Sequence, residues 1–207
     1  MSSRTLWKIG VFTFMAFPAV LLAYWWSLLL QGQPAPALGV NPVQKTVLES
    51  GVFSMRALIF ALAVSPLATL LRRPQILSVR RMLGLFAFFY ASLHGLAYIG
   101  LDQLFSLTTL WEDLLKRWPI SLGMIGWLLL LPLAITSTRG MIKRLGAKNW
   151  KRLHKLVFAV AVAASIHNIL ITKGMQIEPL VHASLLALLV MYRVAGRPRF
   201  PKLSPAT

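Results

Sequence analysis

Six long apolar stretches dominate this sequence and restrict the folds open to it. They cover residues 9–30, 52–71, 82–101, 120–136, 154–171 and 180–195. A helix needs about 20 mainly apolar residues to cross a bilayer, and a helix pairs its own backbone polar groups inside lipid. The pattern therefore predicts an all-α integral membrane bundle of six transmembrane helices. Because the connections are short, we expect residues 1–207 to form a single transmembrane domain.

The composition indicates the same class. Hydrophobic residues make up 57% of the 207 and charged residues only 13%, which is more apolar material than one soluble core needs. The net charge of +17 would suggest nucleic acid in a soluble protein, but here the basic residues lie between apolar stretches, so membrane lipid and not nucleic acid is the expected partner. The chain has no cysteine, which excludes disulfides, thiolate metal sites and covalent haem attachment.

Lysine and arginine are distributed unequally between alternate connections. One set holds most of the 22, namely Arg4, Lys8, Arg72, Arg73, Arg80, Arg81, Arg139, Lys143, Arg144, Lys148, Lys151, Arg152, Arg197, Arg199 and Lys202. The alternate set holds Lys45, Lys116, Arg117 and Lys173. Because such residues accumulate on the cytoplasmic side, both termini are predicted to be cytoplasmic.

Three histidines lie within or at the edge of apolar stretches: His94, His154 and His167. An ionisable side chain in a bilayer marks a functional site by default, and imidazole is a common axial ligand of haem iron. In the predicted topology, His94 and His167 lie on helices that run in the same direction, each about 20 Å from its basic start. We therefore expect these two residues to hold one six-coordinate haem iron, which suits electron transfer.

His154 belongs to a second, inner level. It stands thirteen residues before His167, and a helix of that length separates them by about 20 Å, too far for both to bind one iron. Arg80 lies at the matching depth on the third stretch, and its guanidinium is a poor iron ligand but can pair with a haem propionate. We expect His154 to serve an inner iron site that receives electrons.

Several roles remain open from the residues alone. Arg56 either snorkels to the membrane interface or pairs with a propionate of the outer haem. His182, at the start of the sixth stretch, is a structural or interfacial residue, or alternatively a substitute ligand or a group beside a quinone. All these histidines could instead form hydrogen bonds between helices. We find no nucleotide-binding, protease or hydrolase motif and assign no catalytic residue, so any substrate chemistry is expected on a partner protein.

Short motifs spread from Trp7 to about Arg193 resemble a known family. They are Ser65-Pro66-Leu67, Arg80-Arg81-Met82-Leu83-Gly84-Leu85, Ser92-Leu93-His94, Thr136-Ser137-Thr138, Asn149-Trp150-Lys151-Arg152-Leu153-His154 and Ile166-His167. Their order and spacing are similar to those of the MsrQ family, also called YedZ. These are the haem-binding membrane subunits of bacterial methionine sulfoxide reductase systems, within the ferric reductase and NADPH oxidase transmembrane superfamily.

The resemblance implies a function that the residues alone do not. Family members sit in the bacterial inner membrane and pass electrons from the quinone pool, or from a flavin reductase, through haem b and FMN to a periplasmic molybdopterin reductase, MsrP. That partner reduces methionine sulfoxide in oxidised periplasmic proteins. Two-haem members of the superfamily carry a histidine pair on each of two helices, whereas Arg80 stands where one inner ligand is expected, so one or two haems b remain possible.

Two alternatives stay open beside this interpretation. One is a transmembrane ferric or oxygen reductase that acts directly at the outer haem. The other, from a different class, is a membrane transporter or scaffold without haem, in which the histidines relay protons or pack between helices.

Overall fold

A computed structural model describes residues 3–172 and 176–195; Lys173, Arg197, Arg199 and Lys202, which entered the charge argument, lie outside this range. The described elements are α1 (Ser3–Leu30), η1 (Pro36–Leu38), α2 (Pro42–Leu70), η2 (Pro74–Val79), α3 (Arg80–Ala97), η3 (Tyr98–Asp102), α4 (Leu107–Lys116), α5 (Trp118–Ile135), α6 (Arg139–Leu153), α7 (Leu156–Ile171) and α8 (Ile177–Val194). Five helices are long and apolar enough to cross a membrane, and α6 with α7 gives a sixth span if the bent pair counts as one. The predicted all-α membrane bundle is confirmed.

The second helix extends well beyond its apolar stretch. It begins at Pro42 instead of residue 52 because Asn41 caps it: the Asn41 side chain accepts a hydrogen bond of 3.0 Å from the Gln44 N–H. A proline at the first helical position favours the same start, since its fixed φ already suits a helix. Apolar runs thus mark the lipid-facing part of a helix and not its ends.

The expected span at residues 154–171 corresponds to α7, which begins two residues later, at Leu156. A separate basic helix, α6, precedes it and begins where the Thr138 side chain accepts a hydrogen bond of 3.2 Å from the Met141 N–H. The chain bends by 46° between α6 and α7, so His154 ends α6 at the bend instead of opening a transmembrane helix. The capping residue starts a helix among basic residues, which a search for apolar runs cannot detect.

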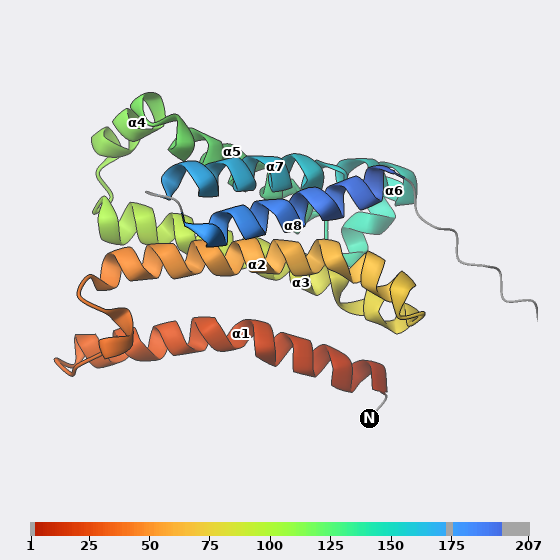
Figure 1. Ribbon diagram of the computed structural model, residues 1–207, viewed down its shortest axis with the longest axis horizontal. Helices are drawn as coiled ribbons and strands as arrows, with labels where there is room; N and C mark the ends of the chain where they lie inside the picture. Colours follow the sequence, from red (N-terminus) through yellow and green to blue (C-terminus); the bar gives the residue numbers. More distant parts are fainter. Residues whose placement is uncertain (1–2, 173–175, 196–207) are drawn as a thin grey trace, which may run out of the picture.

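The long helices run antiparallel to their chain neighbours, and two pairs form the centre of the bundle (Figure 1). Helix α2 packs most extensively on α3, and α5 on α7, while α8 contacts both α2 and α7. Small residues allow the close approach: Ala57 and Ala87 are fully buried between helices. In lipid this packing, and not the burial of apolar surface from water, holds helices together. Helix α1 lies along one side of the bundle with few contacts to α2 and α3.

The two ends of the bundle differ in charge. One end of the bundle holds the start of α1, the whole of α6 and the end of α8 (Figure 1). We call it the basic end, because it carries Arg4, Lys8, Arg72, Arg73 and the basic residues of α6. The opposite end, called the acidic end, includes the starts of α2 and α8 together with α4. All five acidic residues of the chain lie towards it: Glu49, Asp102, Glu112, Asp113 and Glu178.

A buried hydrogen bond ties α1 to the bundle, because the Tyr90 hydroxyl of α3 donates to the Met15 carbonyl at 2.6 Å. We expect Tyr90→Phe to lower the free energy of unfolding by about 0.5–1 kcal/mol, the net contribution of such a bond. The measurement is a denaturant titration in detergent micelles. Tyr24→Phe is the matched control, since Tyr24 is exposed; equal stability of the two variants would contradict the prediction.

Candidate functional site

Two imidazole rings face each other at the centre of the bundle, nearer its acidic end. His94 comes from the last turn of α3 and His167 from the second half of α7. Their ring centroids lie 6.1 Å apart, with an interplanar angle of 83°. Residues that are far apart in the sequence are thus brought together at one depth, as the register of the two parallel helices predicted.

Each ring is fixed by a hydrogen bond to the backbone of a neighbouring helix. His94 Nδ1 lies 2.8 Å from the Val47 carbonyl oxygen of α2, and His167 Nδ1 lies 2.7 Å from the Pro119 carbonyl oxygen of α5. A carbonyl oxygen can only accept, so in both residues Nδ1 carries the proton and donates it. The lone pair of each Nε2 is therefore available to a metal ion, and the bond on the other nitrogen orients the ring, as is usual for ligand histidines.

Two glycines make room for the rings. A Cβ atom on Gly51 would lie 3.0 Å from His94 Nδ1, and a Cβ atom on Gly123 would lie 2.8 Å from His167 Nδ1. Each glycine stands four residues after the carbonyl that its histidine contacts, one helical turn along the same helix face. Both histidine rings therefore pack in the same way, each against a backbone carbonyl and a glycine of one neighbouring helix, α2 for His94 and α5 for His167.

The spacing of the two rings fits ligation of one iron ion. A coordinating nitrogen lies about 2.0 Å from a metal ion and about 1.1 Å from its own ring centre, so two rings on opposite sides of one ion would have centroids about 6.2 Å apart. The observed separation is 6.1 Å. The donor set of two neutral imidazoles in an apolar bundle is one that suits haem iron.

An aromatic layer borders this site on the side of the basic end. Trp127 of α5, one turn beyond Gly123, stacks on Phe88 of α3 at a centroid distance of 6.1 Å. Its indole N–H donates a hydrogen bond of 3.0 Å to the Ser92 hydroxyl. The contact joins α3 to α5, the two helices that connect the α2–α3 pair with the α5–α7 pair.

His154 lies at the basic end with different neighbours. Its ring packs on that of Trp150, with the ring centroids 4.0 Å apart, and its Nε2 lies 3.3 Å from the Thr136 hydroxyl oxygen. The indole N–H of Trp150 donates a hydrogen bond of 3.0 Å to the Thr136 carbonyl. Arg80 is near enough for its charge to act on this imidazole, as expected from their matching depths. The other three histidines of the chain lie elsewhere, so no second imidazole faces His154.

Arg56 and His182 lie on α2 and α8, two helices that pack against each other. The Arg56 guanidinium forms an ion pair of 2.8 Å with Glu178, and its charge also lies over the Phe53 ring. His182 is only 7% exposed and lies in the second turn of α8, and its Nδ1 has no hydrogen-bond partner among the described residues. Neither residue approaches the His94–His167 pair through a contact that the structure describes.

Sequence reasoning identified the facing histidines but missed what holds them. The carbonyls of Val47 and Pro119 carry no side-chain signal at all. Gly51 and Gly123 do carry one, because an isolated glycine within an apolar helix lowers its stability and indicates a close approach by another group. Which group approaches is determined only by the packing of the helices.

Comparisons with known proteins agree with this geometry. Residues 50–165, more than half of the chain, match the family described as "Ferric reductase like transmembrane component". The "Protein-methionine-sulfoxide reductase heme-binding subunit MsrQ" of Caulobacter vibrioides is 42% identical over 172 residues, which cover 83% of this chain and 82% of the relative.

Two further relatives carry the same name. That of Rhodospirillum rubrum is 42% identical over 187 residues, 90% of this chain and 86% of the relative. That of Xanthomonas campestris pv. campestris is 40% identical over 191 residues, 92% of this chain and 86% of the relative. The chain therefore belongs to the MsrQ family of ferric reductase like transmembrane proteins.

Proposed function

We propose that this protein is a b-type cytochrome of the bacterial inner membrane that binds haem b between His94 and His167. The observation that carries the proposal is the pair of facing imidazoles, each with Nδ1 bonded to a backbone carbonyl and Nε2 left to bind iron. The printed names of its relatives, as haem-binding subunits, support the same cofactor. Haem would supply a one-electron carrier there, and His94 and His167 would hold its iron.

Electrons, we propose further, leave for a periplasmic molybdopterin reductase, MsrP, that repairs methionine sulfoxide, and the quinone pool or a flavin reductase is the donor. The relatives' names place them in a methionine sulfoxide reductase system. The excess of Lys and Arg at the basic end supports a cytoplasmic position for that end, and the acidic end then faces the periplasm. The histidine pair lies nearer the acidic end, on the side where MsrP would dock.

FMN belongs to this proposal only through the family resemblance. Its phosphate would find cations at the basic end, where α6 presents Arg139, Lys143 and Arg144 in its first half. His154 lies beside the same helix, and we propose that it serves an inner site with Arg80. A second haem there would have His154 as its single imidazole ligand, so the inner site differs from the outer one in its donor set.

Loss of either facing histidine is expected to remove the outer haem. His94→Ala and His167→Ala each take away one axial ligand, so the low-spin spectrum of bis-histidine haem b disappears and the haem-to-protein ratio falls. The measurement is a reduced-minus-oxidised spectrum with a pyridine haemochrome assay on purified protein. His182→Gln is the control, because its ring lies away from the pair. An unchanged spectrum in either alanine variant would refute the ligand assignment, and a colourless wild type would favour a transporter or scaffold.

The close contact between Gly123 and the His167 ring gives a second prediction. In Gly123→Ala the new Cβ would lie 2.8 Å from the His167 ring, so we expect that ring to be displaced and the haem to be lost or to become high-spin. Gly126→Ala is the matched control on the same helix interface, because its Cβ would lie an ordinary 3.8 Å from the Ala163 Cβ. The measurements are the optical and electron paramagnetic resonance spectra of both variants. Identical low-spin spectra would contradict the prediction that the His167 ring requires a glycine at position 123.

The choice between a partner reductase and direct reduction can be tested with the reduced protein. We expect MsrP with methionine sulfoxide to reoxidise the haem faster than a ferric chelate or oxygen does, because a docked partner would hold its own redox centre close to the haem, whereas a small acceptor reaches it only by collision. Stopped-flow absorbance of the haem band measures the three rates. Rapid reoxidation by the chelate or by oxygen, with no acceleration by MsrP, would favour a ferric or oxygen reductase.

A further inference from the structure

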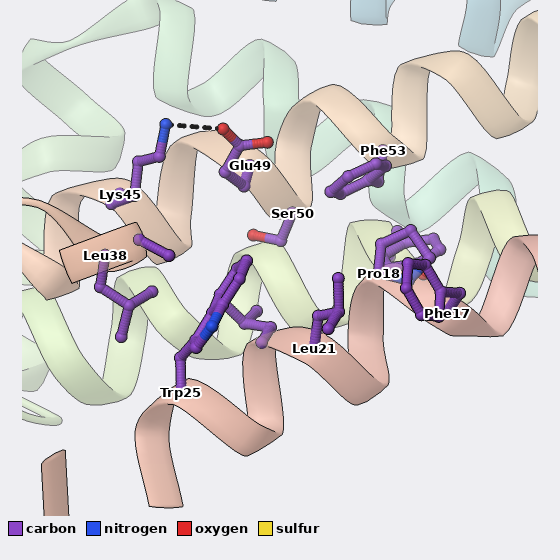
Figure 2. Close-up of a pocket in the computed structure, with 12 residues that line it drawn as sticks. Phe17, Pro18, Leu21, Trp25, Leu38, Lys45, Glu49, Ser50 and Phe53 are labelled. Carbon is purple, nitrogen blue, oxygen red and sulfur yellow. Dashed lines mark ion pairs between the residues drawn. The ribbon is translucent and has the colours of Figure 1, made fainter. Parts of the chain in front are cut away.

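A cavity lies between α1 and the α2–α3 pair, near the acidic end (Figure 2). Its volume is about 370 Å³, within the range of small-molecule sites. Most of its lining is apolar, and α1 supplies five of the twelve lining residues, of which Leu21 and Trp25 extend towards α2. Leu38 of η1 lies at one end. Because α1 packs only sparsely on the bundle, lipid-soluble molecules can reach this cavity from the bilayer.

The cavity has one charged edge and aromatic walls. Lys45 and Glu49 of α2 form an ion pair of 2.8 Å at this edge, with side chains 46% and 35% exposed (Figure 2). Trp25 of α1 and Phe53 of α2 supply flat apolar surfaces in the lining. This combination suits a ligand with a flat ring that carries both hydrogen-bond donors and acceptors, joined to an apolar tail.

Helix α2, which forms one wall of the cavity, also contacts His94 on its other side. The Ser50 hydroxyl, in the lining, donates a hydrogen bond of 2.6 Å to the Thr46 carbonyl and lies 3.0 Å from the Val47 carbonyl oxygen. That Val47 oxygen accepts from His94 Nδ1 at 2.8 Å. The next residue, Gly51, lies against the His94 ring. Tyr90, also in the lining, stands one helical turn before His94 on α3. A ring in the cavity is thus separated from His94 by a single helix.

We propose that this cavity binds a lipid-soluble hydroquinone and that Glu49 accepts a proton from its hydroxyl group. The proposal rests on the proposed function, in that the electron acceptor is the haem between His94 and His167. Glu49 has lone pairs for a hydroxyl proton, and Lys45 has donors for the carbonyl oxygen that oxidation creates. Trp25 and Phe53 hold the ring, and the apolar tail extends into lipid along α1.

The chemistry balances with these groups and the electron-accepting partner. One hydroquinone loses two electrons and two protons and becomes a quinone, so the haem would accept one electron, pass it on to the electron-accepting partner, and then accept the second. The protons pass from the hydroxyl oxygens to Glu49 in turn, and from its carboxylate to water at the acidic end. Electrons from the quinone pool then arrive beside the outer haem without passing His154, which leaves the inner level to a donor on the basic side.

The first test fills the cavity in the full chain, with haem bound, in lipid nanodiscs. Leu21→Trp occupies the space for the ring, and Val20→Trp is the control, since Val20 is 63% exposed on the same helix. We expect haem reduction by decylubiquinol to slow by roughly tenfold or more in Leu21→Trp only, with unchanged dithionite-reduced spectra. Equal rates in the two variants would overturn the proposal, as would a tenfold loss in His154→Ala.

The second test removes the proton acceptor. Glu49→Gln keeps the size of the side chain but lacks the carboxylate charge, and we expect roughly tenfold slower reduction by decylubiquinol. Glu112→Gln is a matched control, because Glu112 forms the same type of ion pair with Lys116, also 2.8 Å and four residues apart, on α4 outside the cavity. A rate in Glu49→Gln equal to that in Glu112→Gln would exclude Glu49 as the acceptor.

A binding measurement separates failure of this inference from failure of the proposed function. A photoreactive azidoquinone should label peptides of α1 and α2 around residues 17–25 and 45–53, in competition with decylubiquinone but not with phospholipid. Labelling elsewhere, or competition by phospholipid, would identify the cavity as a lipid site and overturn the inference while the haem spectrum stands. A wild type without haem that still shows this labelling would instead refute the proposed function alone.

Discussion

The hydrogen bond from each facing imidazole to a main-chain carbonyl is the interaction on which the site depends. It selects the tautomer with the proton on Nδ1, leaves the Nε2 lone pair available to a metal ion, and ties α3 to α2 and α7 to α5. Because a helical carbonyl has a second lone pair, the bond costs the helix nothing, but it requires the ring to approach the backbone closely. Gly51 and Gly123 permit that approach, so backbone packing and ligand geometry are set by the same residues.

Charged residues are distributed unequally between the two ends of the bundle. The acidic residues lie towards the end where α2 and α8 begin, near the histidine pair, while the basic helix α6 and His154 lie at the other end. A lipid-embedded core cannot carry these charges, since each costs several kcal/mol at the centre of a bilayer. The charged residues therefore gather at the two ends, which differ in charge, and the proposed proton release belongs to the acidic end.

The two histidine levels are built on different principles. The outer level has two imidazoles with equivalent supports, whereas His154 at the inner level has an indole, a threonine hydroxyl and the charge of Arg80 around it. The cavity between α1 and α2 adds a polar and aromatic site next to the outer level only. The proposed electron transfer therefore uses the outer level alone and needs no complete chain of carriers across the membrane.

Much of the fold and the choice of histidines could be read from the sequence. Apolar stretches of bilayer length can only be helices, and counting 1.5 Å per residue from the basic ends placed His94 and His167 at one depth. The family resemblance added the cofactor and the partner, which no residue pattern showed. Helix ends were less predictable: α6 and the early start of α2 depend on single capping residues, Thr138 and Asn41, amid polar sequence.

What the sequence by itself determined is therefore the membrane class, the helical periods and the matched depths, because these follow from local composition and a fixed helical rise. Tertiary structure decided which faces meet. Only packing brings the Val47 and Pro119 carbonyls to the imidazoles, pairs Arg56 with Glu178, and opens a cavity behind His94. Every residue has a backbone carbonyl, and no residue type indicates a cavity. Neither feature can therefore be predicted from the sequence before the packing of helices from distant parts of the chain is known.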